Sequence, residues 1–327
     1  MSDLLWPGDR RAGDVFTDEA FVAAMVAVES AWVDTSLTVP DGPFDAEAGG
    51  NAVIPLLAAL RDANPGVDVH TGLTSQDVLD TAMVLMLRDA VGEVRSHLSS
   101  ASSALDQLAA SHGEAPMIGR TLTQWALPIT FGHKVSAWRS GLSGASDDLT
   151  ALAFPAQCGG PVGTVRDDRL ASRLGLDDVP AWHTDRRPIT RIADALTATT
   201  GACGRIARDV LELSRPEIGE VEESSGGGSS SMPHKANPVL SVLVRRAALT
   251  APQLLATLHL CAADQVDERA DGAWHAEWDT LRLLVRRTAV TASQTADLLA
   301  GPQSSSRPPA NTSRAIRNAV FASGTPQ

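Results

Sequence analysis

Tyrosine is absent from the 327 residues of this chain, and aromatic side chains make up only 4% of them. Cysteine is scarce too: Cys158, Cys203 and Cys261 are far apart, with neither metal-ligand spacing nor an even number for disulfides. This excludes a disulfide-stapled domain and argues against a cysteine metal site. A reducing, cytoplasmic setting is the simplest interpretation.

Positive charge is also in short supply, since 27 Lys and Arg face 39 Asp and Glu for a formal net charge of -12. An acidic surface argues against nucleic acid and anionic membranes as partners, because both need a basic face. It leaves room for a small basic pocket that binds an anionic substrate. The first residues lack the basic start of a signal peptide. We expect no uncharged apolar run near the ~18 residues that span a membrane.

Helical patterns dominate the chain, and its 43% hydrophobic content is enough for a sizeable core. Thr17 is a capping residue ahead of apolar residues at helical spacing. Thr74 and Ser75 start a second helix that we expect to run to His112, about 55 Å. Further helices are predicted over 128–153, 189–214, 237–263 and 276–300. No stretch alternates strictly between apolar and polar residues, so the prediction is an all-α bundle of long helices.

The length is enough for two domains. We expect an N-terminal helical domain over 1–112 and a central long-helix bundle domain over 113–300. The last segment, 301–327, is polar and rich in proline and serine, which is typical of a disordered tail.

The loop at residues 226–238 is the most informative segment about function. Its three glycines and the serines that follow leave the backbone with few steric limits, whereas Pro233 and Pro238 restore constraint. A loop that is loose at one end and fixed at the other suits a lid that closes on a ligand. A plain Gly/Ser linker is the alternative, but a linker has no use for the second half of the pattern.

The segment 228–237, G-S-S-S-M-P-H-K-A-N, resembles the signature loop of the fumarase/aspartase superfamily, G-S-S-x-M-P-x-K-x-N. In that superfamily the first serine is the base that removes a proton next to a carboxylate, while the lysine and asparagine bind substrate carboxylate. The resemblance therefore implies a catalytic role for Ser229 and substrate binding by Lys235 and Asn237.

A second segment, 70–77, reads H-T-G-L-T-S-Q-D and opens a helix. The free N–H groups and the positive dipole end of a helix favour an anion, and two hydroxyls add donors. A simple capping box is the alternative interpretation. The segment resembles H-x-G-x-T-S-x-D of the adenylosuccinate lyases. That resemblance implies that Thr74 and Ser75 hold a substrate carboxylate and that His70 belongs to the same site.

A third segment, 119–132, begins G-R-T-L-T-Q-W-A and resembles another superfamily motif. Leu122 stands where most members carry a histidine, and leucine cannot transfer a proton, so the identity of a second acid–base group is left open. The resemblance implies that Arg120 binds carboxylate and that Thr121 and Gln124 line the site. A salt bridge at a helix end is the alternative for Arg120.

Three more segments, 157–164, 182–186 and 272–278, resemble the bacterial 3-carboxy-cis,cis-muconate cycloisomerases; the last reads G-A-W-H-A-E-W. His183 and His275 are possible site residues, and core histidines flanked by tryptophan are the alternative. Asp185 and Arg187 depart from that branch, which usually has glutamine and aspartate there. They change the local charge beside the presumed anion site, so the substrate is less certain than the family.

The resemblance covers about residues 5–300, and we expect most of the family's C-terminal third domain to be missing. It implies a cycloisomerase that converts 3-carboxy-cis,cis-muconate to 4-carboxymuconolactone in protocatechuate (β-ketoadipate) catabolism. It also implies a small polycarboxylate substrate, no cofactor or metal, and a homotetramer with shared active sites. Two alternatives stay open: another lyase of the superfamily, adenylosuccinate-type or a specialised C–N lyase, and a degenerate paralogue that assembles without catalysing.

Overall fold

The structure is a computed structural model that describes residues 4–223, 227–228, 231–232 and 236–301. Ser229, Lys235 and all of the predicted tail except Gly301 lie outside these residues. The chain is 63% helix and 6% strand, which confirms the predicted all-α fold class. The domain boundary at residue 112 remains a prediction.

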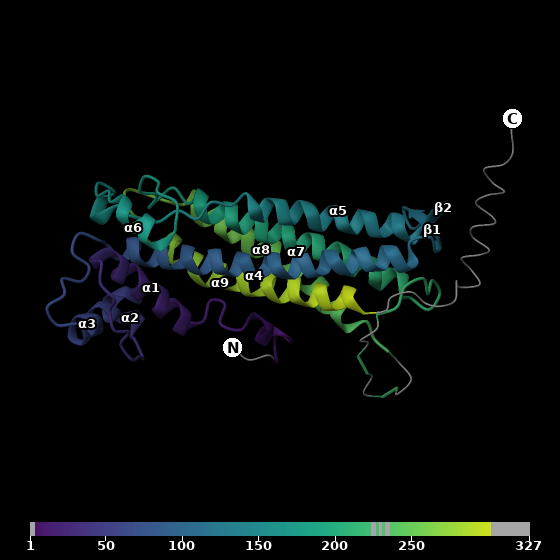
Figure 1. Cartoon of the computed structure of the whole chain (residues 1–327), viewed down its shortest axis with the longest axis horizontal. Helices are drawn as coiled ribbons and strands as arrows, with labels where there is room; N and C mark the ends of the chain where they lie inside the picture. The colour runs from purple at the N-terminus through teal and green to yellow at the C-terminus, as the bar shows by residue number, and fades with distance from the viewer. Residues whose placement is uncertain (1–3, 224–226, 229–230, 233–235, 302–327) are drawn as a thin grey trace.

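The elements follow one another as η1 (Asp9–Ala12), α1 (Asp18–Val33), α2 (Ala46–Gly49), α3 (Val53–Ala63), α4 (Ser75–His112), β1 (Pro116–Thr121), β2 (Gln124–Thr130), α5 (Phe131–Thr150), η2 (Gly160–Val162), α6 (Asp168–Leu174), α7 (Arg187–Leu213), α8 (Val239–Ala263) and α9 (Gly272–Ala300). Figure 1 shows α4, α5, α7, α8 and α9 running side by side along the longest axis. The short helices α2, α3 and α6 gather at one end of this bundle, and the β1–β2 hairpin lies at the other.

The central helix α4 begins after Thr74 and ends at His112, as its sequence predicts. Every residue from 76 to 87 is buried, on all faces of the helix, so this part of α4 is surrounded by the rest of the chain. Asp77 and Asp80 are among these buried residues. Buried carboxylates require partners, and theirs are described below.

The other long helices agree with the prediction, with small differences at their ends. The Thr17 side chain accepts a hydrogen bond from the Ala20 N–H at 3.2 Å and starts α1 as expected. The predicted helix over 276–300 begins earlier, at Gly272, because Asp271 caps it by accepting from the Gly272 N–H at 2.7 Å. The short helices α2, α3 and α6 were not predicted.

The prediction of a helix from residue 128 is wrong at its start. Residues 116–130 form an antiparallel hairpin, and α5 begins only at Phe131. Leu122 and Thr123 at the hairpin tip have φ of 48° and 70°, as a tight two-residue turn requires. No residue of β2 is fully buried, so this strand lacks the alternating pattern that predicts strands from sequence.

Helix α8 presents apolar side chains to the outside of the bundle. Val242 is 52% exposed, Leu249 61% and Leu260 70%. Residues 247–263 carry no Asp, Glu, Lys or Arg, which corrects the expectation that no uncharged run approaches membrane-spanning length. Length and composition alone do not separate a membrane helix from a bundle helix. Val242, Leu249 and Leu260 therefore form an exposed apolar stripe along α8.

The three cysteines are all buried and free. Burial raises the pKa of the Cys158 and Cys203 thiols to about 11, and burial also raises the pKa of Cys261. Since the thiolate is the reactive form, these side chains act as small apolar core residues.

Candidate active site

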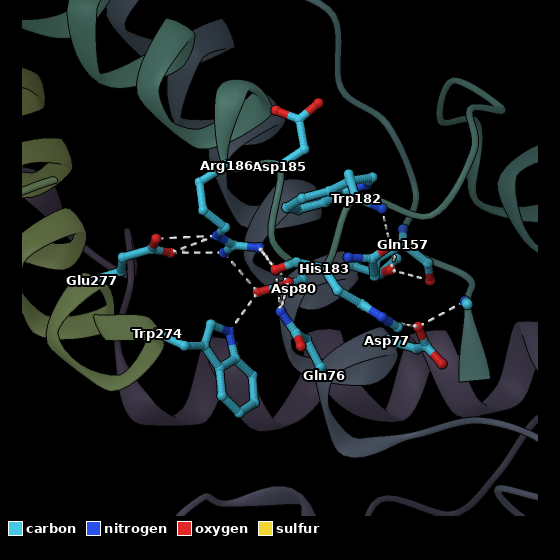
Figure 2. Close-up of polar contacts among 12 residues, drawn as sticks. Gln76, Asp77, Asp80, Gln157, Trp182, His183, Asp185, Arg186, Trp274 and Glu277 are labelled. Carbon is cyan, nitrogen blue, oxygen red and sulfur yellow. Dashed lines mark hydrogen bonds and ion pairs between the residues drawn. The ribbon is translucent and has the colours of Figure 1, made fainter. Parts of the chain in front are cut away.

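The amino end of α4 is held by the carboxylate of Asp77, which is completely buried. One oxygen, Oδ2, accepts from the Thr74 N–H at 3.0 Å and the Gly160 N–H at 2.9 Å. The other, Oδ1, accepts from the Gly159 N–H and from His183 Nε2, both at 2.9 Å. Four donors from three separate segments therefore fix the turn that contains the predicted anion-binding residues, and Figure 2 shows one of them, His183, beside Asp77.

The two possible site histidines have opposite environments. His183 is only 5% exposed and its Nε2 contacts Asp77, so the core alternative describes it correctly. The core alternative is wrong for His275, which is exposed. The Nδ1 of His275 lies 2.8 Å from the Asp271 carbonyl, and its ring packs on Trp278 with centroids 4.6 Å apart. A carbonyl only accepts, so Nδ1 carries the proton and the Nε2 of a neutral His275 is an acceptor.

His70 forms a dyad with a buried glutamate. Its Nδ1 lies 2.6 Å from Oε1 of Glu29, whose side chain is fully buried, while the His70 side chain is 14% exposed. The backbone of His70 has φ of 72°, a left-handed conformation that is uncommon for a residue other than glycine. Because Nδ1 of His70 contacts Glu29, the other ring nitrogen, Nε2, is not engaged by Glu29.

A fully buried ion-pair network lies beside Asp77. Arg186 donates from Nη1 to Asp80 Oδ2 at 2.7 Å and from Nη2 to Glu277 Oε2 at 2.7 Å. Trp274 Nε1 donates to Asp80 Oδ1 at 3.0 Å, and Gln76 Nε2 donates to Asp80 Oδ2 at 3.1 Å. Figure 2 shows Arg186 between the two carboxylates. One guanidinium thus ties α4, α9 and the start of α7 together.

Burial by itself lowers the pKa of Arg186, but Asp80 and Glu277 outweigh it and raise that pKa above its usual range. Arg186 is therefore a permanent cation in the core. Burial raises the pKa of the Glu277 carboxyl, and contact with Arg186 opposes that rise. The tryptophan-rich segments at 182–186 and 272–278 supply most of this network, so their immediate physical role is to support the site.

The sequence did not reveal Asp80, Arg186 and Glu277 as a unit. The available signal was the position of Asp80 among the apolar residues of α4, one turn after Asp77. A charged residue on a face that must be buried calls for an opposite charge from elsewhere in the chain.

Asp185 and Arg187, the two departures from the cycloisomerase pattern, pair with each other. Arg187 Nε donates to Asp185 Oδ1 at 2.7 Å and to Oδ2 at 2.9 Å. Hydrogen bonding to Arg187 lowers the pKa of Asp185. The two opposite charges sum to zero, and both side chains are exposed. The branch's usual glutamine and aspartate would carry a net charge of -1, so the local charge here is one unit less negative, as predicted, although the two charges offset each other.

At the far end of the bundle, Arg120 in β1 is held by Glu220. Its Nη1 donates to Oε2 at 2.8 Å and its Nη2 to Oε1 at 3.2 Å. The alternative for Arg120 is thus correct in the salt bridge but wrong in its place, because Arg120 lies in a strand and not at a helix end, and the sequence did not identify its partner. Thr121 and Gln124 are exposed on the hairpin, whose tip carries Leu122 at 95% exposure.

The base of the 226–238 loop lies near the start of α8. The Gly227 N–H donates to the Asn237 carbonyl at 2.8 Å, and the Asn237 N–H donates to the Gly227 carbonyl at 2.8 Å. Asn237 Nδ2 also donates to the Gly228 carbonyl at 3.3 Å. Glu223 caps α8 by accepting from the Leu240 N–H at 2.8 Å and the Ser241 N–H at 3.0 Å. Ser229 and Lys235 belong to the part of this loop outside the described residues.

The described site residues fall into two groups at opposite ends of the bundle. One group is His70, Thr74, Ser75, His183 and His275, and the other is Arg120, Thr121, Gln124 and Asn237. Helix α4 separates Ser75 from the hairpin that carries Arg120, and its 38 residues span about 57 Å (Figure 1). A single chain does not bring the two groups together.

Comparison with known proteins shows which proteins this chain resembles in sequence. A family model described as lyase matches residues 44–251. A nitrosuccinate lyase from Streptomyces davaonensis is 38% identical, over 87% of this chain and 71% of that protein. A 3-carboxy-cis,cis-muconate cycloisomerase from Bradyrhizobium diazoefficiens is also 38% identical, over 85% of this chain and 66% of that protein.

The fold has a solved counterpart. The crystal structure of 3-carboxy-cis,cis-muconate lactonizing enzyme from Pseudomonas putida superposes with a TM-score of 0.86 at 29% identity. The superposition covers 98% of this chain and 80% of that one. The matches thus cover 66% to 80% of the length of these proteins.

Proposed function

This chain belongs to the lyase family of the fumarase/aspartase superfamily, and we propose that it is an enzyme that lactonises 3-carboxy-cis,cis-muconate to 4-carboxymuconolactone. The observation that carries the proposal is the signature segment at 228–237 in a chain that matches named cycloisomerases in sequence and in fold. The segment 272–278 supports the same branch.

The substrate of this reaction carries three carboxylates, and the proposed site offers matching donors. Thr74 and Ser75 stand at the amino end of α4, where Thr74 and Asp77 form the capping box considered above and the helix dipole favours an anion. We assign the other carboxylate contacts to Lys235 and Asn237. Asp77 has all four of its acceptor positions occupied, so its part is to hold the turn rather than to touch the substrate.

In the chemical step, an oxygen of one carboxylate bonds to a carbon of the double bond and closes a γ-lactone. The electron pair of that double bond moves to the neighbouring carbon, where an adjacent carboxylate delocalises the charge. That carbon then takes up a proton, which Ser229 delivers and regains from solvent. Fixed donors aimed at the adjacent carboxylate are the largest expected contribution to rate.

The proposed site is shared between chains, because one chain keeps its two groups of residues at opposite ends of α4. Antiparallel packing of bundles would place the α4 end of one subunit beside the hairpin and loop of others. The exposed apolar stripe of α8 supplies a surface for such packing. We therefore propose a homotetramer.

Light scattering is expected to give a mass near four times the 34.2 kDa of the chain. Leu249→Glu places a charge in the α8 stripe and is expected to dissociate the assembly, since burying an unpaired charge is strongly unfavourable. Ala23→Glu, on an exposed position of α1, is the matched control and should leave the mass unchanged. A monomeric wild-type chain would contradict the shared site.

The lactonisation itself is directly observable, because the conjugated diene of 3-carboxy-cis,cis-muconate absorbs in the ultraviolet and the lactone does not. Purified protein is expected to remove this absorbance without an added metal or cofactor. If tetrameric protein leaves the absorbance unchanged, the cycloisomerase assignment fails.

A lyase acting on nitrosuccinate is the second candidate, favoured by the 38% identity to the Streptomyces davaonensis protein over 87% of this chain. In that reaction Ser229 would remove the proton next to a carboxylate and nitrite would leave. Nitrite release from nitrosuccinate, with 3-carboxy-cis,cis-muconate left intact, selects this candidate. Cleavage of adenylosuccinate would select the adenylosuccinate-type alternative, and no turnover of any of the three would favour a degenerate paralogue.

A further inference from the structure

A cavity of about 830 Å³ lies between α1, the 39–52 segment, α4 and α9. Its walls are mainly apolar and include Phe16, Phe21, Phe44, Leu79, Met83 and Trp278. Its size falls within the range of small-molecule sites, roughly 300–1,000 Å³. None of the predicted site residues lines it, so the proposed lactonisation does not account for this cavity.

Two buried donors that belong to residues of the cavity lining have no acceptor among the described residues. They are the indole Nε1 of Trp278 and the guanidinium Nε of Arg282, one turn apart on α9. The other end of the Arg282 side chain is engaged, because Nη1 donates to Asp18 Oδ1 at 2.9 Å. A buried N–H without a partner is unfavourable, so an acceptor oxygen placed between these two groups would be stabilised.

The charges around the cavity select against anions. Four carboxylates, those of Asp18, Glu19, Asp41 and Asp279, are exposed residues of its lining, and Arg282 is the one cation of the lining. Four negative charges and one positive charge leave a formal charge of -3. The rim therefore repels the polycarboxylates that the proposed active site requires.

We propose that this cavity is a second binding site, for an uncharged and mostly apolar small molecule with a carbonyl oxygen. The apolar body lies against the phenylalanine, leucine and methionine side chains, and the carbonyl accepts from Trp278 Nε1 and Arg282 Nε. The site goes beyond the proposed function and does not depend on it, because the ligand differs from the substrate in charge and in location.

Calorimetric titration with 2-naphthamide and 2-naphthoate tests the site, since the two probes share a ring system and differ in charge. The amide is expected to bind at least tenfold more tightly than the naphthoate. Equal binding of both probes, or no binding of the amide, overturns the proposal. Because binding rather than turnover is measured, failure here is distinguishable from failure of the lactonisation assay.

Two variants and one control locate the bound probe. Ala46→Trp fills the cavity from an exposed wall position on α2, whereas Ala48→Trp adds the same bulk to an exposed position of α2 outside the lining. The first is expected to abolish amide binding and the second to leave it unchanged. Trp278→Phe keeps an aromatic ring but removes the N–H donor, and is expected to weaken amide binding about fivefold. Unchanged binding in Ala46→Trp or in Trp278→Phe overturns the proposed location.

Discussion

Replacing Arg186 by methionine is expected to lower the free energy of unfolding by about 3–5 kcal/mol, because it strands two buried carboxylates. The Arg186 and Asp80 side chains are fully buried and that of Glu277 is 1% exposed, so water cannot solvate the charges left behind. Trp274 and Gln76 would still donate to Asp80, but neither neutralises it. Denaturant unfolding at a fixed protein concentration measures the loss.

The adjacent residue is the matched control for this variant. Arg187 also pairs with an aspartate, but both partners are exposed, and exposed pairs contribute little. Arg187→Met is therefore expected to leave the unfolding midpoint unchanged. Arg186→Lys, which keeps the charge but loses the planar fork that contacts both carboxylates, should fall between the two. Equal losses for Arg186→Met and Arg187→Met would show that the buried network does not stabilise the fold.

Replacing Ser229 by alanine is expected to reduce turnover by about 10²–10⁴-fold, the usual contribution of a positioned acid–base group. Under the proposed function, Ser229 delivers the proton that completes lactone formation, and alanine has no proton to give. Steady-state assays with 3-carboxy-cis,cis-muconate measure this loss.

Fold and assembly are expected to be unaffected by this change, because a loop of glycine and serine contributes little to the core. Thermal melting and light scattering check both properties. Ser230→Ala is the matched control and is expected to keep most of its turnover. An inactive Ser230→Ala together with an active Ser229→Ala would move the catalytic role to the second serine.

The long helices were predictable because their signals are local. Thr17 and Thr74 are capping residues followed by apolar residues at helical spacing, and these patterns lie within a few turns of chain. The hairpin was missed for the same reason. Its strand β2 is exposed along most of its length, so no local apolar pattern distinguishes it from the start of a helix.

The motifs located the candidate site, but the contacts within it were not predictable. Asp77 stands in a predicted segment, yet its partners Gly159 and His183 lie 82 and 106 residues further along the chain. Arg120 meets Glu220, 100 residues away. Spacing along one sequence carries no information on such pairs, because the packing of separate helices decides them.

The long sequence separation between Asp77 and His183 also determines when their contact can form during synthesis on the ribosome. At about 5–20 residues per second, His183 is added roughly 5–20 s after Asp77. During that interval the apolar run that follows Asp77 on α4 has already been synthesised. The segments that later cover it have not yet been added to the chain. Nascent chains stalled shortly before Gly159 should therefore recruit chaperones through this run, and chains stalled after Arg186 should do so less.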